Sequence, residues 1–187
     1  METVLQVLNK PVDAFRARNT KVAWGLVILT ILVNSVLEPL LQYISDKEHD
    51  TFDLPKTALT VVLSIATYLA INVVIWLAGK CFGSRTSFMN YTKTWGLTYV
   101  PTLLCSIVVA ITEAYFYLFW NSVVWGMVFN IVFVGILLWK TILYIIYLRE
   151  VAELKRGNLV GAFILIGFFI LILAAVNGYF GIKTPVL

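Results

Sequence analysis

The stretch LVGAFILIGFFILILAAVNGYF, residues 159–180, contains no charged side chain. A helix needs about 20 predominantly apolar residues to cross the hydrocarbon core of a bilayer. Four earlier stretches have a similar length and composition. Each of them contains at most one charged residue, which is a glutamate or a lysine. The sequence therefore predicts an all-α integral membrane bundle over residues 22–187, with spans at about 22–43, 57–77, 95–118, 122–147 and 159–180.

The composition supports lipid as the solvent of this chain. Hydrophobic residues make up 60% of the 187 residues and charged residues 13%, whereas soluble domains are about 45–50% apolar and about 25% charged. A chain of this length cannot bury five apolar helices against one another in water. The net charge of +4 does not indicate nucleic acid, because the basic residues lie at the ends of the apolar blocks and form no stripe.

The basic residues predict an orientation in the membrane. Cytoplasmic loops carry an excess of lysine and arginine, and every loop of this chain agrees with one assignment. We therefore expect a multi-pass cell-membrane protein with a cytoplasmic N-terminus and an external C-terminus. The predicted cytoplasmic side holds Lys10, Arg16, Arg18, Lys21, Lys80, Arg85, Lys93, Arg149, Lys155 and Arg156, and the other side holds Lys47, Lys56 and Lys183.

Residues 1–21 form a separate cytoplasmic segment that is amphipathic. Val4, Leu5, Val7 and Leu8 recur at helical spacing, and basic residues follow them. This pattern is typical of a helix that lies in the membrane interface. The alternative is a frayed tail.

A few polar residues inside the predicted spans are candidates for a functional site. Ionisable groups inside a membrane are costly and often functional, so Glu38, Glu113 and Lys140 indicate a possible transport path. The alternative is that the glutamates reach the headgroups and that the lysine extends to the inner surface. Amides in four spans predict hydrogen bonds between helices or, alternatively, a polar path; they are Asn34, Asn72, Asn130 and Asn177.

The sequence gives little support to an enzyme. Nucleophilic catalysis needs a nucleophile with a base beside it, and the single histidine, His49, lies in a predicted outer loop. Neither a phosphate-binding glycine loop nor a metal-ligand spacing is present. We therefore expect a non-enzymatic protein without a cofactor.

Two segments resemble the Yip family (Ypt/Rab-interacting proteins), in particular its short bacterial members. The first is AGKCFGSRTSFMNYTKTWGLTYVP, residues 78–101, and the second is 147–157, which is similar to the family's cytoplasmic link into its last span. In the first segment the resemblance depends on Gly83, Ser87, Phe88, Gly96, Tyr99 and Pro101.

The resemblance implies a five-span bundle that acts as an adaptor in membrane organisation or as an accessory to a transporter such as an ABC exporter, through other membrane proteins or self-association. Eukaryotic relatives bind Rab-type GTPases and carry a long cytosolic N-terminal region. We do not expect GTPase binding here, because about twenty residues precede the first span. The alternative function is a small transporter or channel. The predicted interaction face comprises Lys80, Arg85, Phe88, Tyr91, Arg149, Glu150, Lys155 and Arg156.

Overall fold

The computed structural model describes residues 2–45, 54–115, 119 and 122–179. Within these ranges the chain is helical and has no strand. The elements are α1 (Glu2–Asn9), α2 (Pro11–Ala17), α3 (Thr20–Leu32), η1 (Val33–Leu37), α4 (Glu38–Ser45), α5 (Leu54–Cys81), α6 (Phe88–Trp95), η2 (Gly96–Thr98), α7 (Tyr99–Ala114), α9 (Val123–Glu150) and α10 (Arg156–Tyr179).

Five helical segments are long and apolar enough to cross a membrane, which confirms the predicted all-α bundle. They are Thr20–Leu41, Thr57–Cys81, Phe88–Ala114, Val123–Glu150 and Arg156–Val176. The third span begins earlier than the predicted residue 95. Its first turns are helical but carry Thr92 and Thr94, whose burial against neighbouring helices is not visible in hydropathy.

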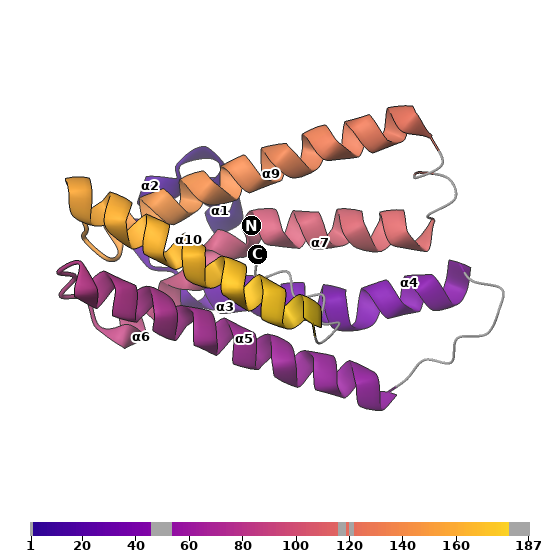
Figure 1. Cartoon of the computed structure of the whole chain (residues 1–187), viewed down its shortest axis with the longest axis horizontal. Helices are drawn as coiled ribbons and strands as arrows, with labels where there is room; N and C mark the ends of the chain where they lie inside the picture. The colour runs from indigo at the N-terminus through magenta and orange to yellow at the C-terminus, as the bar shows by residue number, and fades with distance from the viewer. Residues whose placement is uncertain (1, 46–53, 116–118, 120–121, 180–187) are drawn as a thin grey trace.

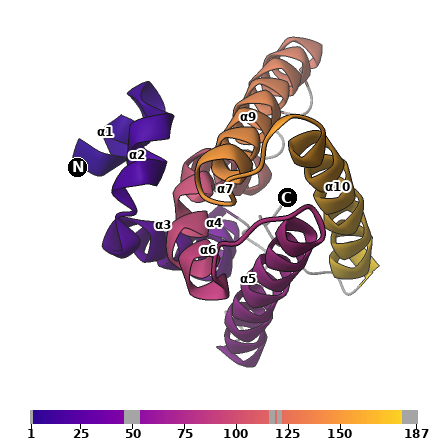
Figure 2. The ribbon, with the colours of Figure 1, turned by 90° about the vertical axis from the view of Figure 1, so that its left-hand side faces the viewer.

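The five spans run side by side along the long axis of the molecule (Figure 1). The third, which combines α6, η2 and α7, is central, because 61% of its most apolar stretch is buried inside the protein, against 11% for the fifth. Helix α7 contacts α3, α4 and α9, whereas α10 contacts α5 and α9. Seen from one end, α6 lies among α3, α5 and α9, and α10 lies at the edge (Figure 2).

The central span is less hydrophobic than the fifth, with a mean hydropathy of 1.7 against 3.0. Several of its buried hydroxyl groups bond to carbonyl oxygens about one turn earlier in the same helix. Thr94 donates to Asn90 (2.6 Å), Thr98 to Trp95 (2.8 Å) and Ser106 to Thr102 (2.9 Å). A small polar side chain that is satisfied in this way permits close approach of neighbouring helices without an exposed polar group.

Two spans contain an irregular turn, and each turn includes the residue four positions before a proline. Proline has no N–H group, and its ring clashes with the carbonyl group four residues earlier. For Pro39 that residue is Ser35, inside the π-helical turn η1, and for Pro101 it is Leu97, inside the 3₁₀ turn η2. Widened or tightened turns are a known way to accommodate such a clash. The prolines therefore explain where both irregularities lie.

The N-terminal segment forms two short helices that pack against the bundle. Pro11 occupies the first turn of α2, where its missing N–H group costs no helical hydrogen bond. Ala14 and Phe15 of α2 are buried, and α2 contacts α9. Figure 2 shows both helices at the side of the bundle, next to the start of α3. The amphipathic helix was predicted, but the break at Pro11 and the packing of Phe15 on the protein were not.

Gly96 provides a test of how the first and third spans pack. A Cβ atom at this position would overlap the backbone carbonyl group of Ala23, and a backbone cannot move aside as a flexible side chain can. We expect Gly96→Ala to destabilise the folded protein by about 1–3 kcal/mol, the usual cost of overpacking. The measurement is the thermal unfolding midpoint in detergent.

Gly135→Ala is the matched control, because a Cβ atom there would meet nothing within 4 Å. This change should leave the midpoint equal or slightly higher, since alanine favours a helix. Equal midpoints for the two variants would contradict the close approach of Gly96 and Ala23.

Candidate interaction site at the basic end

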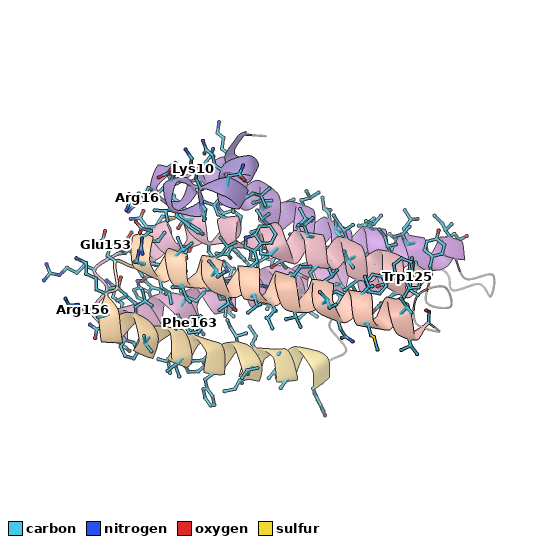
Figure 3. The ribbon with its side chains drawn as sticks, turned by 90° about the horizontal axis from the view of Figure 1, so that it is seen from above. Lys10, Arg16, Trp125, Glu153, Arg156 and Phe163 are labelled. Carbon is cyan, nitrogen blue, oxygen red and sulfur yellow. The ribbon has the colours of Figure 1, made fainter. Side chains whose placement is uncertain are left out.

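One end of the bundle carries most of the basic residues, and we call it the basic end. It is formed by α1, α2, the starts of α3, α6 and α10, and the last turns of α5 and α9. Figure 3 shows Arg16, Glu153 and Arg156 at this end and Trp125 at the opposite end. The predicted segregation of charge along the sequence is therefore a segregation in space.

Five aromatic residues from three helices form a cluster beneath the basic end: Phe15 of α2, Tyr91 and Trp95 of α6, and Tyr144 and Tyr147 of α9. The Tyr147 ring is central, with its centroid 5.7 Å from Phe15, 5.9 Å from Tyr91 and 4.9 Å from Trp95, all edge-to-face. Trp95 also lies 4.7 Å from Tyr144. Aromatic pairs at such distances contribute about 0.5–1.5 kcal/mol beyond burial. The cluster therefore joins the N-terminal helix to two spans.

Hydrogen bonds connect this cluster to the loops at the basic end. Tyr147 donates its hydroxyl proton to the Tyr91 carbonyl oxygen (3.0 Å), and Tyr91 donates to Ser84 Oγ (2.9 Å). Thr86 Oγ1 donates to the Val151 carbonyl oxygen (2.8 Å), which ties the loop after α5 to the residues after α9. All these donors are buried. The two segments that resemble the Yip family thus contact one another in the folded protein.

The loop between α5 and α6 depends on backbone freedom at glycine. Gly83 has φ = 89°, a left-handed conformation that residues with a side chain rarely adopt. Its neighbour Ser84 then donates its N–H group to the Gly79 carbonyl oxygen (2.8 Å). This turn places Ser84 where it accepts the hydrogen bond from Tyr91.

The charged rim of the basic end includes one carboxylate bound by two arginines. Glu150, the last residue of α9, accepts hydrogen bonds from Arg16 Nε and Arg149 Nε, both at 2.8 Å. The Glu150 side chain is 10% exposed, whereas those of Arg16 and Arg149 are 63% and 58% exposed. Arg16 therefore joins α2 to α9 beside the contact of Phe15 with Tyr147.

The predicted interaction face is exposed in most of its members. The exposed members are Lys80, Arg85, Arg149, Lys155 and Arg156. Phe88 is half-buried, and its ring lies 5.7 Å from the Trp76 ring.

The prediction that Tyr91 belongs to the interaction face is corrected, because its side chain is fully buried. Its i, i+4 spacing to Trp95 places both rings on one face of α6, and that face turns toward α9. Sequence reasoning also missed Phe15 and Tyr144 as members of the cluster. The sequence did contain one indication of the cluster. Tyr144 and Tyr147 are three residues apart, which places both rings on one face of the helix.

The ionisable residues of the predicted polar set lie at different depths. Glu113 is half-buried next to the last residue of α7, at the end opposite the basic end. Lys140 is 5% exposed and lies ten residues before Glu150, or about 15 Å at 1.5 Å per helical residue. Its Nζ lies 5.7 Å from the centroid of the Tyr144 ring. The backbone of Glu38 begins α4, and its side chain lies outside the described part of the chain.

The asparagines differ from the prediction in the bonds they make. Asn34 and Asn72 donate their amide protons to the carbonyl oxygens of Thr30 and Tyr68, both at 2.8 Å and both four residues earlier in the same span. These bonds lie within a helix, not between helices, because a short amide side chain reaches back one turn. Asn130 is exposed on α9, and the Asn177 side chain lies outside the described residues.

A groove of about 260 Å³ opens between α9 and α10, and Trp95 and Ile75 form part of its wall. Its other walls are mostly aliphatic and aromatic, and Lys140 is the member of the predicted polar set that lines it. The polar set therefore does not line one common cavity in the part of the chain whose side chains are described.

The architecture is that of a multi-pass helical membrane protein whose loops are organised at one end. It contains the features on which the resemblance to the Yip family depends. These are the glycine-containing turn after the second span, the proline in the third span and the link between α9 and α10. The family model of the Yip1 domain matches residues 5–176, and the chain belongs to this family. No curated protein and no solved structure matches the chain.

Tyr147 tests the role of the aromatic cluster. Tyr147→Phe keeps the ring and removes the hydroxyl group, which leaves the Tyr91 carbonyl oxygen without this donor. We expect a loss of about 1 kcal/mol in the free energy of unfolding. Tyr147→Ala also leaves a cavity beneath Phe15 and should cost about 3–5 kcal/mol. Chemical denaturation in detergent micelles measures both losses.

Tyr43→Phe is the control, because Tyr43 is 51% exposed and the change should be nearly neutral. The α2 helix provides a second readout. If the cluster holds α2 on α9, proteolysis near Arg16 and Arg18 should accelerate in Tyr147→Ala. An unchanged cleavage rate would contradict that link.

Proposed function

We propose that this chain is a non-enzymatic membrane adaptor, or an accessory subunit in transporter assembly, in the cell membrane of a bacterium. Membership of the Yip1 domain family supports a role through protein contacts. The observation that carries the proposal is the construction of the basic end. Exposed cations such as Arg85 and Lys155 lie in loops that buried hydrogen bonds hold together. Such a surface is pre-organised, so its binding to a partner costs little ordering entropy.

The dispersal of the intramembrane polar residues favours the adaptor over the transporter alternative. A transport path needs polar groups that converge on water or substrate. Glu113 and Lys140 lie toward opposite ends of the bundle, and Asn130 is exposed on the membrane-facing surface of α9. The groove beside Lys140 is mainly apolar, which suits a helix or an acyl chain better than an ion.

The proposed orientation places the basic end in the cytoplasm and the C-terminus outside. This follows from the excess of lysine and arginine at the basic end. In a bacterial host, alkaline phosphatase fused after Leu187 should be active and green fluorescent protein fused there should be dark. Fusions after Lys155 should show the reverse. Phosphatase activity after Lys155 together with fluorescence after Leu187 would contradict the orientation.

The adaptor proposal is tested by co-purification from native membranes under gentle extraction. We expect the protein to be recovered with at least one other membrane protein or with itself. Because the exposed cations after α5 and α9 are the proposed contact, Arg85→Glu with Lys155→Glu should reduce the recovered partner by about tenfold, as the loss of two or three contacts would. Quantitative mass spectrometry after crosslinking measures the recovery.

Lys10→Glu with Lys21→Glu is the matched control, because both lysines are exposed and the change in net charge is the same. This control should retain the partner. Recovery of the parent protein as a lone monomer would refute the adaptor. Equal losses in the two double variants would show a general charge effect and not a specific contact.

A further inference from the structure

The N-terminal helices present a cationic surface on the flank of the bundle. Three exposed cations mark its corners: Lys10 directly precedes α2, Arg18 directly follows it, and Lys21 lies in the first turn of α3. We call these three residues the flank cations. Figure 3 shows Lys10 on the flank of the bundle and Arg156 at its tip. The flank cations therefore form a second charged surface, apart from the loops after α5 and α9.

The flank cations are held in place by packing, which a topology signal does not require. Val7 of α1 and Phe15 of α2 belong to the buried core, and the Phe15 ring lies 5.7 Å from the Tyr147 ring. Arg16 is bound to Glu150 at 2.8 Å. An excess of cations along the sequence is enough to orient a span. A surface whose backbone is fixed by buried contacts is, in addition, pre-organised to bind a ligand.

The depth of this surface along the spans is that of the lipid headgroups. Both N-terminal helices lie at the side of the bundle, next to the start of α3 (Figure 2), where lipid surrounds a membrane protein. Trp24 is 36% exposed and lies three residues, or about 4.5 Å, further into the span than Lys21. Because exposed tryptophan favours the boundary between headgroups and acyl chains, Lys21 lies at about the depth of the phosphates.

The N-terminal helices also expose an apolar side chain beside the flank cations. Leu8 of α1 is 43% exposed, although its neighbour Val7 is buried against the protein. An amphipathic helix with cations on one side and leucine on another is typical of segments that bind at the boundary of headgroups and acyl chains. Leu8 and Trp24 therefore match the apolar part of a lipid, and the flank cations match its headgroup.

The charge and the place of the surface together select its occupant. Asp13 is the only acid in residues 6–25, so the surface attracts anions. Each lysine or arginine near an anionic leaflet adds to the attraction. A soluble protein can reach the tip of the basic end, whereas a surface beside the spans at headgroup depth is in direct contact with lipid.

We propose that the flank cations bind the phosphate groups of anionic phospholipids in the surrounding leaflet, while Leu8 and Trp24 contact the upper part of the acyl chains. The N-terminal helices then select the lipid that surrounds this side of the protein. This inference goes beyond the adaptor function, because the protein contact proposed above lies in the loops after α5 and α9.

The test uses the purified full chain in vesicles of phosphatidylcholine and phosphatidylglycerol in equal amounts. A photo-crosslinking residue replaces Leu8, and mass spectrometry identifies the captured lipid. We expect about tenfold more capture of phosphatidylglycerol, because several cations act on its net negative charge. The preference should fall when the salt concentration rises from about 0.1 M to about 1 M, which shortens the screening length from about 10 Å to about 3 Å.

Two pairs of substitutions identify the surface. Lys10→Gln with Lys21→Gln should reduce the preference to about twofold or less. Arg85→Gln with Lys155→Gln is the matched control, because it removes the same charge from the loops and should leave the preference unchanged. A photo-crosslinking residue at Val123, which is 74% exposed at the opposite end of the bundle, should capture both lipids equally. The thermal midpoint of each variant verifies that it is folded.

Equal capture of the two lipids at Leu8 in the parent chain would overturn the proposal. Equal losses in the two double variants would show an effect of net charge alone and would also overturn it. If Lys10→Gln with Lys21→Gln keeps the lipid preference but loses a native protein partner on co-purification, the flank is a protein contact and the lipid assignment falls. The adaptor function is judged separately, by the partner recovered with Arg85→Glu and Lys155→Glu, so either proposal can fail while the other stands.

Discussion

In the hydrocarbon core of a bilayer, a backbone group that leaves its helical hydrogen bond finds no water to replace it. Pro39 and Pro101 each remove one donor and crowd one carbonyl group inside a span. The wide turn η1 and the tight turn η2 absorb these two disturbances. Because η2 also contains Gly96, the same tight turn sets the close approach of the third span to Ala23 of the first. The arrangement of the central helices depends on this accommodation.

The central position of the third span explains its composition. A helix that faces lipid must be apolar around its circumference, whereas a helix that faces other helices can carry hydroxyl groups. Thr94, Thr98 and Ser106 donate to carbonyl oxygens of their own helix, so these three hydroxyl groups need no partner from a neighbouring helix. The fifth span, which is the more hydrophobic of the two compared, lies at the edge.

The basic end and the groove share residues. Trp95 packs on Tyr147 in the aromatic cluster and also lines the groove, and Tyr144 belongs to both as well. Tyr147 in turn contacts Phe15 of α2. A continuous set of ring contacts therefore connects the membrane-facing groove to the N-terminal helix. The groove and the proposed cytoplasmic contact therefore belong to one packed unit.

The sequence by itself determined the number and order of the spans, the separation of charge between the two ends, and the family. These follow from local properties, because hydropathy over about twenty residues and the position of each cation need no knowledge of neighbours. Only the tertiary structure decided which span is central, that Tyr91 is buried, that Phe15 packs on Tyr147, and that Lys140 lines a groove without Glu113. Each of these depends on which face of a helix meets another helix, and apolar spans such as 159–180 have almost no polar residues that would mark a face.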